Sequence, residues 1–559
     1  MKKRPADKAG LSLAGWRPGT PVSLALLTAI ACLITLPFIF KAFHVDDTVF
    51  VWLGQQKLKD PLALGLPSHA YEGNFFPLYL DTHPPLLSSY LSLLIRICGG
   101  ASEAGLHLGF VIFPVLAAVS IYFLARRFTS SALIAALLFL LTPGFVVMSQ
   151  SVMTDVPSLA LCLAAVASYI YALDRGGSRR LLAVTAVAAS LAVLTTYQSF
   201  SLIPLLFLYA WLRRRFSWRE LAPLAAALGV FAAVILYNYH VTGGPPKLSY
   251  STGLNLAPAF LADKVLAAVS VVGGATIFPL LLAAGMLKGK KDYLFLGGVG
   301  AAILALFLAR VANGQYTLAA ALLQTVFYTV GILAIYRITS TGLDAALAEE
   351  RTDSGRDDIF LALWFYGVLG YSLVLLPYAS TRYLLPLFPP VILMFVRYAR
   401  GVIGESGRWL RFGAAAVVLT AAVSLSAAVA DYQLSGLYRD FATDNAPPLT
   451  ADGHRLWFAG EFGLRYYLEQ AGGRYLTRDD NSPRPGDHVV LSKKLISSFV
   501  SSDLMSRLQL ERTLDFGSDW PVRVQDPASL AGFYDQFHGN LPYSLASGPM
   551  EQISVYEVK

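Results

Sequence analysis

Apolar runs of membrane-spanning length fill most of the chain up to residue 430, and they constrain its fold more than any other feature. An apolar segment of roughly 16–25 residues crosses the hydrocarbon core as an α-helix, because every backbone polar group must be satisfied within the segment. The runs lie near residues 22–43, 106–125, 131–149, 156–173, 181–196, 199–212, 220–239, 263–286, 293–310, 316–336, 359–377, 383–399 and 410–430. They predict a polytopic α-helical membrane protein with about thirteen transmembrane helices.

The composition supports a membrane protein and argues against nucleic-acid binding. Charged residues make up 14% of the 559-residue chain and hydrophobic residues 55%, whereas soluble domains carry roughly 25% charged residues. The net charge of +8 comes mostly from short loops between apolar runs, where positive residues set topology. We therefore expect membrane lipids, and no nucleic acid, among the partners. The three cysteines have no disulfide or metal-type spacing.

Positive residues fix the orientation of the predicted helices. If residues 1–21 are cytoplasmic, alternate loops should be basic. Those loops contain Arg126 and Arg127; Arg175, Arg179 and Arg180; Arg213, Arg214, Arg215 and Arg219; Lys288, Lys290 and Lys291; Arg337, Arg351 and Arg356; and Arg397, Arg400, Arg408 and Arg411. The opposite loops are nearly free of Lys and Arg, and the exceptions are Lys247, Arg310 and Arg382. The alternation predicts a multi-pass membrane protein with a cytoplasmic N-terminus.

The same rule separates three regions. The transmembrane part covers residues 22–430, and within it residues 44–105 form the first outer loop, on the side opposite the cytoplasm. The stretch 84–98 is apolar but short, and counting it as a span would break the alternation, so we expect an interfacial helix there. An odd number of spans puts residues 431–559 on the same outer side, opposite the cytoplasm. Strand-like runs such as HVVLS and ISVYEV, with an amphipathic helix in EFGLRYYLEQAGG, predict a small α/β domain. We expect the polar loop 338–358 to be a flexible connector.

Polar residues that could carry chemistry gather at helix ends on the outer face. HVDDTVFVW, at the exit of the first span, holds His44, Asp46 and Asp47, and adjacent carboxylates point in different directions on a helix. The alternative is that one aspartate only caps the next helix. DTHPPL holds His83, which could donate to a phosphate or belong to an ordinary capping turn.

Two further residues lie on this face. Asp155 in MTDVP either caps a helix or faces a substrate. Arg382 in TRYLLP either binds a phosphate or extends to a lipid headgroup. This group of acidic residues, a histidine and an arginine lies on one membrane face beside a large loop. Its composition favours a lipid-phosphate substrate. Sugar transfer needs a carboxylate base and cationic donors or a metal for the departing phosphate.

At these residues the chain resembles the GT-C superfamily, and more narrowly the bacterial branch of aminoarabinose–lipid A transferases and protein O-mannosyltransferase-like (glycosyltransferase 39-like) enzymes. The matching motifs are Asp46-Asp47, His83-Pro84-Pro85-Leu86, Met153-Thr154-Asp155-Val156-Pro157 and Arg382-Tyr383-Leu384-Leu385-Pro386. The thirteen-span layout with an outer C-terminal domain is also similar. The resemblance covers the membrane part, most clearly residues 40–210.

The resemblance implies a protein of the bacterial inner membrane, with residues 44–105 and the domain 431–559 in the periplasm. It also implies an inverting transfer, on the periplasmic face, of a hexosyl or pentosyl group from a polyprenyl (undecaprenyl) phosphate carrier. The acceptor would be a hydroxyl on lipid A, a glycolipid, a polysaccharide or a protein. Asp46 matches the catalytic base and Asp155 the second functional acid. The substrate-binding residues would be Asp47, His83, Arg382, Tyr383 and Gln198. His83 and the Tyr197-Gln198 pair stand where the aminoarabinose branch has basic residues, which leaves room for a divalent metal cation held by Asp46 and Asp155.

Two other functions fit parts of the pattern. A lipid-linked sugar flippase or transporter would place its site near the midplane, at broken helices and repeats, and the chain has few charges there. An O-antigen ligase or polymerase using diphosphate-linked donors is harder to distinguish by residues alone. The sequence names neither the sugar nor the acceptor.

Overall fold

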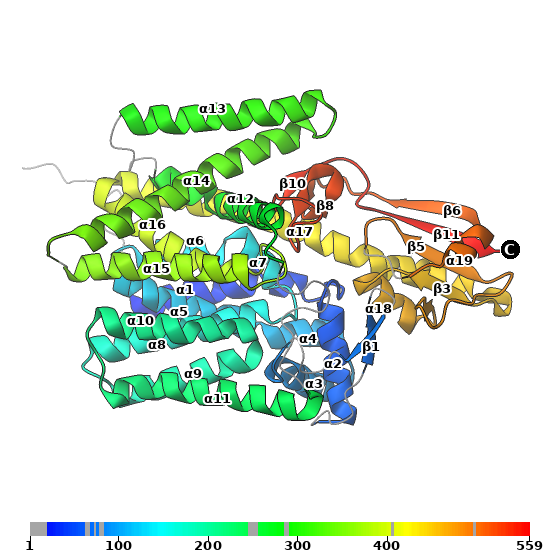
Figure 1. The fold of residues 1–559 in the computed structure, drawn as a ribbon, viewed down its shortest axis with the longest axis horizontal. Helices are drawn as coiled ribbons and strands as arrows, with labels where there is room; N and C mark the ends of the chain where they lie inside the picture. The colour runs from blue at the N-terminus through cyan, green and yellow to red at the C-terminus, as the bar shows by residue number, and fades with distance from the viewer. Residues whose placement is uncertain are drawn as a thin grey trace, which may run out of the picture.

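The computed structural model describes residues 19–61, 68–71, 74–77, 83–243, 255–283, 290–350, 352–403, 407–495 and 499–559. The predicted cytoplasmic N-terminus therefore lies almost wholly outside the described residues. A bundle of roughly aligned helices forms one part of the molecule, and a smaller domain with a sheet lies against one end of it (Figure 1). The main hydrophobic core runs through the bundle and into the smaller domain.

Each predicted apolar segment coincides with one helix or a broken pair. The helices of the bundle are α1 (Thr20–Leu33), α4 (Glu103–Phe110), α5 (Ile112–Phe128), α6 (Ala132–Leu140), α7 (Pro143–Met148), α8 (Asp155–Asp174), α9 (Arg179–Thr195), α10 (Leu202–Leu212), α11 (Trp218–Thr242), α12 (Pro258–Ala283), α13 (Lys290–Ala312), α14 (Leu318–Leu347), α15 (Asp353–Val374), α16 (Phe388–Ile403) and α17 (Gly407–Leu449). Eight helical segments among the described residues are long and apolar enough to cross a membrane. The predicted polytopic helical fold is confirmed, while the count of thirteen crossings stays a prediction.

The predicted first outer loop contains helices that differ in direction from the bundle. Helix α2 (Asp47–Lys59) runs across the ends of the bundle helices and packs against α3 (Leu86–Cys98) (Figure 1). At their contact a Cβ on Gly54 would lie 2.9 Å from the Cβ of Leu91, so only glycine allows this approach. The helix expected at residues 84–98 is present as α3. Between α2 and α3, β1 (Ser68–Tyr71) pairs antiparallel with β2 (Asn74–Pro77).

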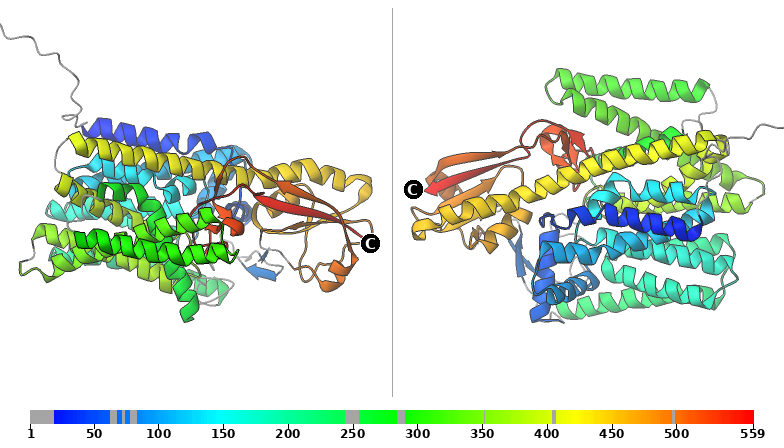
Figure 2. Two further views of the ribbon diagram at one scale, coloured as in Figure 1. Left: turned by 90° about the horizontal axis from the view of Figure 1, so that it is seen from above. Right: turned by 180° about the vertical axis from the view of Figure 1, so that it is seen from behind.

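Two segments are more helical than the sequence indicated. Most of the expected connector 338–358 is helical, because α14 extends to Leu347 and α15 begins at Asp353. Helix α17 continues through position 431 to Leu449, and Figure 2 shows it running from the bundle into the smaller domain. The polar residues after 430 thus begin on a helix that joins the two parts of the molecule.

The smaller domain has the expected α/β composition. Its five-stranded sheet has the order β4-β3-β5-β11-β6. The strands are β3 (Leu456–Ala459), β4 (Arg474–Tyr475), β5 (His488–Ser492), β6 (Leu508–Phe516) and β11 (Glu551–Val558). Strand β3 is parallel to β4 and β5, whereas β11 is antiparallel to β5 and β6. The predicted amphipathic helix is α18 (Phe462–Gln470), and α19 (Ser502–Arg507) precedes β6.

Short elements complete this domain near the bundle. They are β7 (Val522–Arg523), β8 (Gln525–Asp526), β9 (Ala531–Gly532) and β10 (Ser544–Leu545). Strand β7 pairs with β10 and β8 with β9. The segment between β9 and β10 returns to the bundle, where Tyr543 donates a hydrogen bond to the carbonyl of Gly274 in α12 at 3.0 Å.

The end of the bundle away from this domain carries a network of ion pairs. Asp357 accepts hydrogen bonds from Arg127 at 2.9 Å and from Arg213, and Arg397 lies 3.6 Å from it. These arginines come from loops and helix ends that the alternation of charge assigned to one side. Their meeting at one end of the bundle supports the predicted arrangement of the loops.

Candidate active site

An ion pair joins the first outer loop to the loop before α16. The Asp46 carboxylate lies 2.6 Å from Nη1 of Arg382. Asp46 occupies the N-cap position of α2, but its side chain accepts no capping hydrogen bond. The structure therefore does not show the capping hydrogen bond of the alternative interpretation, and a role of Asp46 at a substrate stays a prediction. Its side chain is 32% exposed, whereas that of Arg382 is 5% exposed, so the acid faces the open side of the pair.

Arg382 is held by aromatic hydroxyls as well as by Asp46. Its Nη2 donates to the hydroxyl of Tyr378 at 2.9 Å and of Tyr383 at 3.3 Å, and its guanidinium lies 4.8 Å from the ring centroid of Tyr383. Burial opposes the charge, but the attraction of Asp46 and, more weakly, of Asp155 keeps the pKa of Arg382 well above its usual value. Its buried Nε has no hydrogen-bond partner among the described residues. The guanidinium thus retains one donor for a further acceptor.

Asp155 and His83 lie near this pair. Asp155 is the first residue of α8 and interacts electrostatically with Arg382 and Asp46. The ring of His83 meets that of Phe50 edge-on, with centroids 4.9 Å apart. Burial lowers the pKa of His83 to about 4, so at neutral pH it is a neutral donor or acceptor and not a second cation.

Asp47 points away from its neighbour, as adjacent positions on a helix require. It is fully buried, and its Oδ1 accepts a 2.8 Å hydrogen bond from the backbone N–H of Val152. Burial raises the pKa of Asp47 to about 6, which Lys41 and His44 only partly offset. Asp47 therefore ties α2 to the loop before α8, and the structure does not bring it to the substrate face with Asp46.

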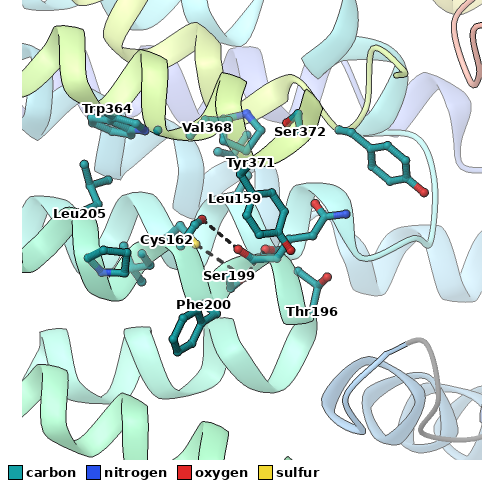
Figure 3. Close-up of a pocket in the computed structure, with 18 of the residues that line it drawn as sticks. Leu159, Cys162, Thr196, Ser199, Phe200, Leu205, Trp364, Val368, Tyr371 and Ser372 are labelled. Atoms are coloured by element: carbon teal, nitrogen blue, oxygen red, sulfur yellow. Dashed lines mark hydrogen bonds between the residues drawn. The ribbon is translucent and has the colours of Figure 1, made fainter. Parts of the chain in front are cut away.

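A cavity of about 720 Å³ extends from Arg382 into the bundle. Asp155, Gln198, Arg382 and Tyr383 line it, together with apolar side chains from α8, α10 and α15. Figure 3 shows Leu159 and Cys162 of α8, Trp364 and Tyr371 of α15, and Ser199 of η3 (Tyr197–Ser201) around this cavity. Four predicted site residues thus share one cavity, and Asp46 and His83 lie beside it. Such a polar end on an apolar chamber suits an amphipathic ligand.

A second buried cluster behind Asp46 was not predicted from the sequence. Lys41 lies 2.5 Å from the carboxylate of Asp431 in α17, and the hydroxyl of Tyr534 donates to the same carboxylate at 2.9 Å. His44 Nε2 lies 3.2 Å from the Tyr534 hydroxyl. A lysine within an apolar run was the signal that could have drawn attention to it, because ionisable residues there are costly without partners.

The described residues do not by themselves form a complete metal site. No group of three or more His, Cys, Asp or Glu side chains in this part of the chain is arranged to hold an ion. Of the two predicted ligands, Asp46 already has Arg382 as its partner. We therefore derive no reaction step through a metal.

The fold and the site define a polytopic membrane protein with an acid–arginine pair where its helical bundle meets a soluble domain. Residues 82–239 match the family described as dolichyl-phosphate-mannose-protein mannosyltransferase. This match confirms the predicted resemblance to GT-C glycosyltransferases over the segment that holds His83, Asp155 and Gln198. No curated protein sequence matches the chain.

Several solved structures have a similar helical arrangement. ArnT from Cupriavidus metallidurans in the apo state is 14% identical, with coverage of 96% of this chain and 98% of that one and a TM-score of 0.41. The oligosaccharyltransferase of Archaeoglobus fulgidus is 16% identical in a complex with Zn and sulfate, with coverage of 81% and 62% and a TM-score of 0.47. The same enzyme with an inhibitory peptide and a dolichol-phosphate is 15% identical, with coverage of 82% and 64% and a TM-score of 0.45. The chain spans less than two thirds of the archaeal enzyme, and the proposed function rests on the site and the family match.

Proposed function

We propose that this protein transfers a sugar from a polyprenyl phosphate carrier to an acceptor hydroxyl, with inversion at the sugar C1, on the membrane face that carries the C-terminal domain. The observation that carries the proposal is the 2.6 Å ion pair between Asp46 and Arg382 at the mouth of an apolar cavity. In a bacterium with the predicted orientation, that face is periplasmic and the carrier is undecaprenyl phosphate.

The two chemical parts of the donor, an isoprenoid chain and a phosphate, match the apolar walls and the polar end of the cavity. Isoprenoid carbons would lie along the apolar walls from α8, α10 and α15, and the phosphate would lie at Arg382. The Nε of Arg382 is buried and has no partner among the described residues, and a phosphate oxygen that reaches it would accept its hydrogen bond while Nη1 stays near Asp46. The hydroxyl of Tyr378 is a further donor beside it. An arginine with planar, forked donors is suited to phosphate recognition.

The reaction balances with these residues. The acceptor oxygen attacks the sugar C1 as its proton passes to the carboxylate of Asp46. The bond between C1 and the phosphate oxygen breaks, and polyprenyl phosphate leaves with its new negative charge facing Arg382. Asp155, which interacts with both members of the pair, would orient the acceptor hydroxyl or contact a divalent cation. The acceptor would be lipid A, another glycolipid, a polysaccharide or a protein.

The test is sugar transfer in proteoliposomes with a panel of radiolabelled polyprenyl-phosphate sugars and a crude lipid and protein acceptor extract. We expect the wild type to transfer one of these sugars, and Asp46→Asn and Asp155→Asn to lose transfer while remaining folded. A parallel arm with chelator-treated protein tests the divalent cation, because full activity there excludes it. Movement of lipid across the bilayer without transfer would instead support a flippase, and transfer only from diphosphate-linked donors would support a ligase.

A further inference from the structure

One short segment of the C-terminal domain contacts both loops that form the acid–arginine pair. Residues 533–537 follow β9, and they carry no regular secondary structure. On the Arg382 side, the carbonyl of Phe533 accepts a 2.9 Å hydrogen bond from the backbone N–H of Thr381. The side-chain oxygen of Gln536 accepts a 2.8 Å hydrogen bond from the N–H of Ala379. Residues 533–537 thus accept hydrogen bonds from two backbone N–H groups of the loop before α16, which carries Arg382 and is called the arginine loop.

The same segment reaches the loop that carries Asp46. The hydroxyl of Tyr534 donates to Asp431 at 2.9 Å and lies 3.2 Å from Nε2 of His44, two positions before Asp46. The rings of His44 and Tyr534 also meet edge-on, with centroids 5.3 Å apart. Tyr534, His44 and Asp431 are at most 2% exposed, so water does not compete for these contacts.

Local contacts keep the segment in one conformation. Asp535 accepts hydrogen bonds from the backbone N–H of Phe537 at 2.9 Å and of His538 at 3.1 Å. Its carboxylate also meets the ring of His538 at 2.8 Å and the side chain of Gln525 at 2.7 Å. A turn that is fixed by its own side chains can transmit the position of the sheet domain to whatever it touches.

We propose that Tyr534 and Gln536 are positioning residues through which the C-terminal domain sets the geometry between Asp46 and Arg382. This inference rests on the proposed function, because it concerns the same pair. Gln536 acts on the arginine loop and therefore on the donor phosphate. Tyr534 positions the segment that carries His44 and Asp46, and it therefore affects proton transfer from the acceptor. Neither residue contacts the pair itself, so neither is a catalytic residue.

The experiment compares Tyr534→Phe, Gln536→Ala and Gln536→Glu with a matched control, Tyr543→Phe. The control removes one buried hydrogen bond between the same domain and the bundle, but at Gly274. We expect Tyr534→Phe to lower kcat about 10- to 100-fold with an unchanged KM for the donor, since small displacements of a reacting group have effects of this size. Gln536→Ala should raise the donor KM about tenfold, and Gln536→Glu, which keeps the accepting oxygen, should restore it. Tyr543→Phe should keep wild-type kcat and KM.

Hydrogen–deuterium exchange supplies a readout that does not depend on transfer. Exchange of the peptide around residues 379–383 should accelerate in Gln536→Ala, exchange around residues 44–48 should accelerate in Tyr534→Phe, and Tyr543→Phe should change neither. If the wild type transfers sugar but Tyr534→Phe and Gln536→Ala match the control in kcat and KM, the positioning role is refuted and the proposed function stands. If hydrogen–deuterium exchange of the two loops changes as expected but neither the wild type nor any variant transfers sugar, the proposed function fails. The coupling of the C-terminal domain to the loops then remains.

Discussion

The pair between Asp46 and Arg382 predicts opposite effects of one substitution, Asp46→Asn, on catalysis and on binding of the leaving group. Asparagine keeps the shape of the side chain but cannot accept the acceptor's proton. General-base catalysis contributes roughly 10²- to 10⁴-fold to a rate, so transfer should fall by a factor in this range.

Binding of polyprenyl phosphate should become tighter in the same variant, because Arg382 loses a competing carboxylate. Two unit charges about 4 Å apart attract by roughly 4 kcal/mol at an effective dielectric constant of 20. Asp46 is 32% exposed, however, and water screens the pair. Measured energies of exposed pairs reach about 1 kcal/mol, which corresponds to roughly a fivefold decrease in Kd.

The assay pairs single-turnover transfer with equilibrium binding of radiolabelled polyprenyl phosphate to purified protein in nanodiscs. Asp440→Asn is the matched control, since Asp440 is exposed in α17 and pairs with Arg439. We expect both quantities to stay at wild-type values in the control. Unchanged transfer by Asp46→Asn would refute its role as base, and unchanged or weaker binding would refute the competition for Arg382.

Three further substitutions test the fold around the site. Lys41→Met leaves the buried Asp431 without its closest cation and should cost about 3–5 kcal/mol of stability, most of which Lys41→Met/Asp431→Asn should recover in thermal melting. Gly273→Ala should lower the melting temperature, because its Cβ would lie 1.8 Å from a backbone carbonyl of α14, whereas Gly297→Ala, with open space around it, should not. The folded-state pKa of Asp47, raised to about 6 from 3.8, means that wild-type stability falls as pH rises between these values. Asp47→Asn has no carboxyl group to titrate and lacks this loss. The melting temperature of the variant minus that of the wild type should therefore increase as pH rises to about 6 and stay constant above that pH. The same pH dependence in both proteins would contradict the raised pKa of Asp47.

Much of the bundle could be predicted from the sequence because its elements depend on local patterns. Apolar length locates the helices, and Gly and Pro locate their ends. The continuation of α17 beyond 430 was missed, since a helix half in the bundle and half against a soluble domain loses its apolar signal while its backbone hydrogen bonds continue. The helical ends of α14 and α15 were missed for the same reason.

The site divides along similar lines. Asp46, Asp155 and Arg382 could be proposed because a charge on the outer face stands out against apolar surroundings. The partners of Lys41 could not be predicted, because a lysine at the end of an apolar run usually extends to the membrane interface. Only the fold brings Asp431 and Tyr534 close to Lys41. Local sequence also cannot tell which of two adjacent aspartates turns inward, and here the N–H of Val152 decides it for Asp47.

The position of Arg382 between an acid and the proposed phosphate site gives the pair a role beyond binding. Before transfer, the carboxylate of Asp46 and the phosphodiester of the donor would each carry about one negative charge. As the acceptor's proton reaches Asp46, that carboxylate becomes neutral, and the departing phosphate approaches about two negative charges. The total charge around Arg382 therefore stays constant while its centre moves from the acid to the leaving group. A buried guanidinium that is already charged and held by Tyr378 and Tyr383 can follow this shift with little reorganisation, which is how preorganised electrostatics lower a barrier.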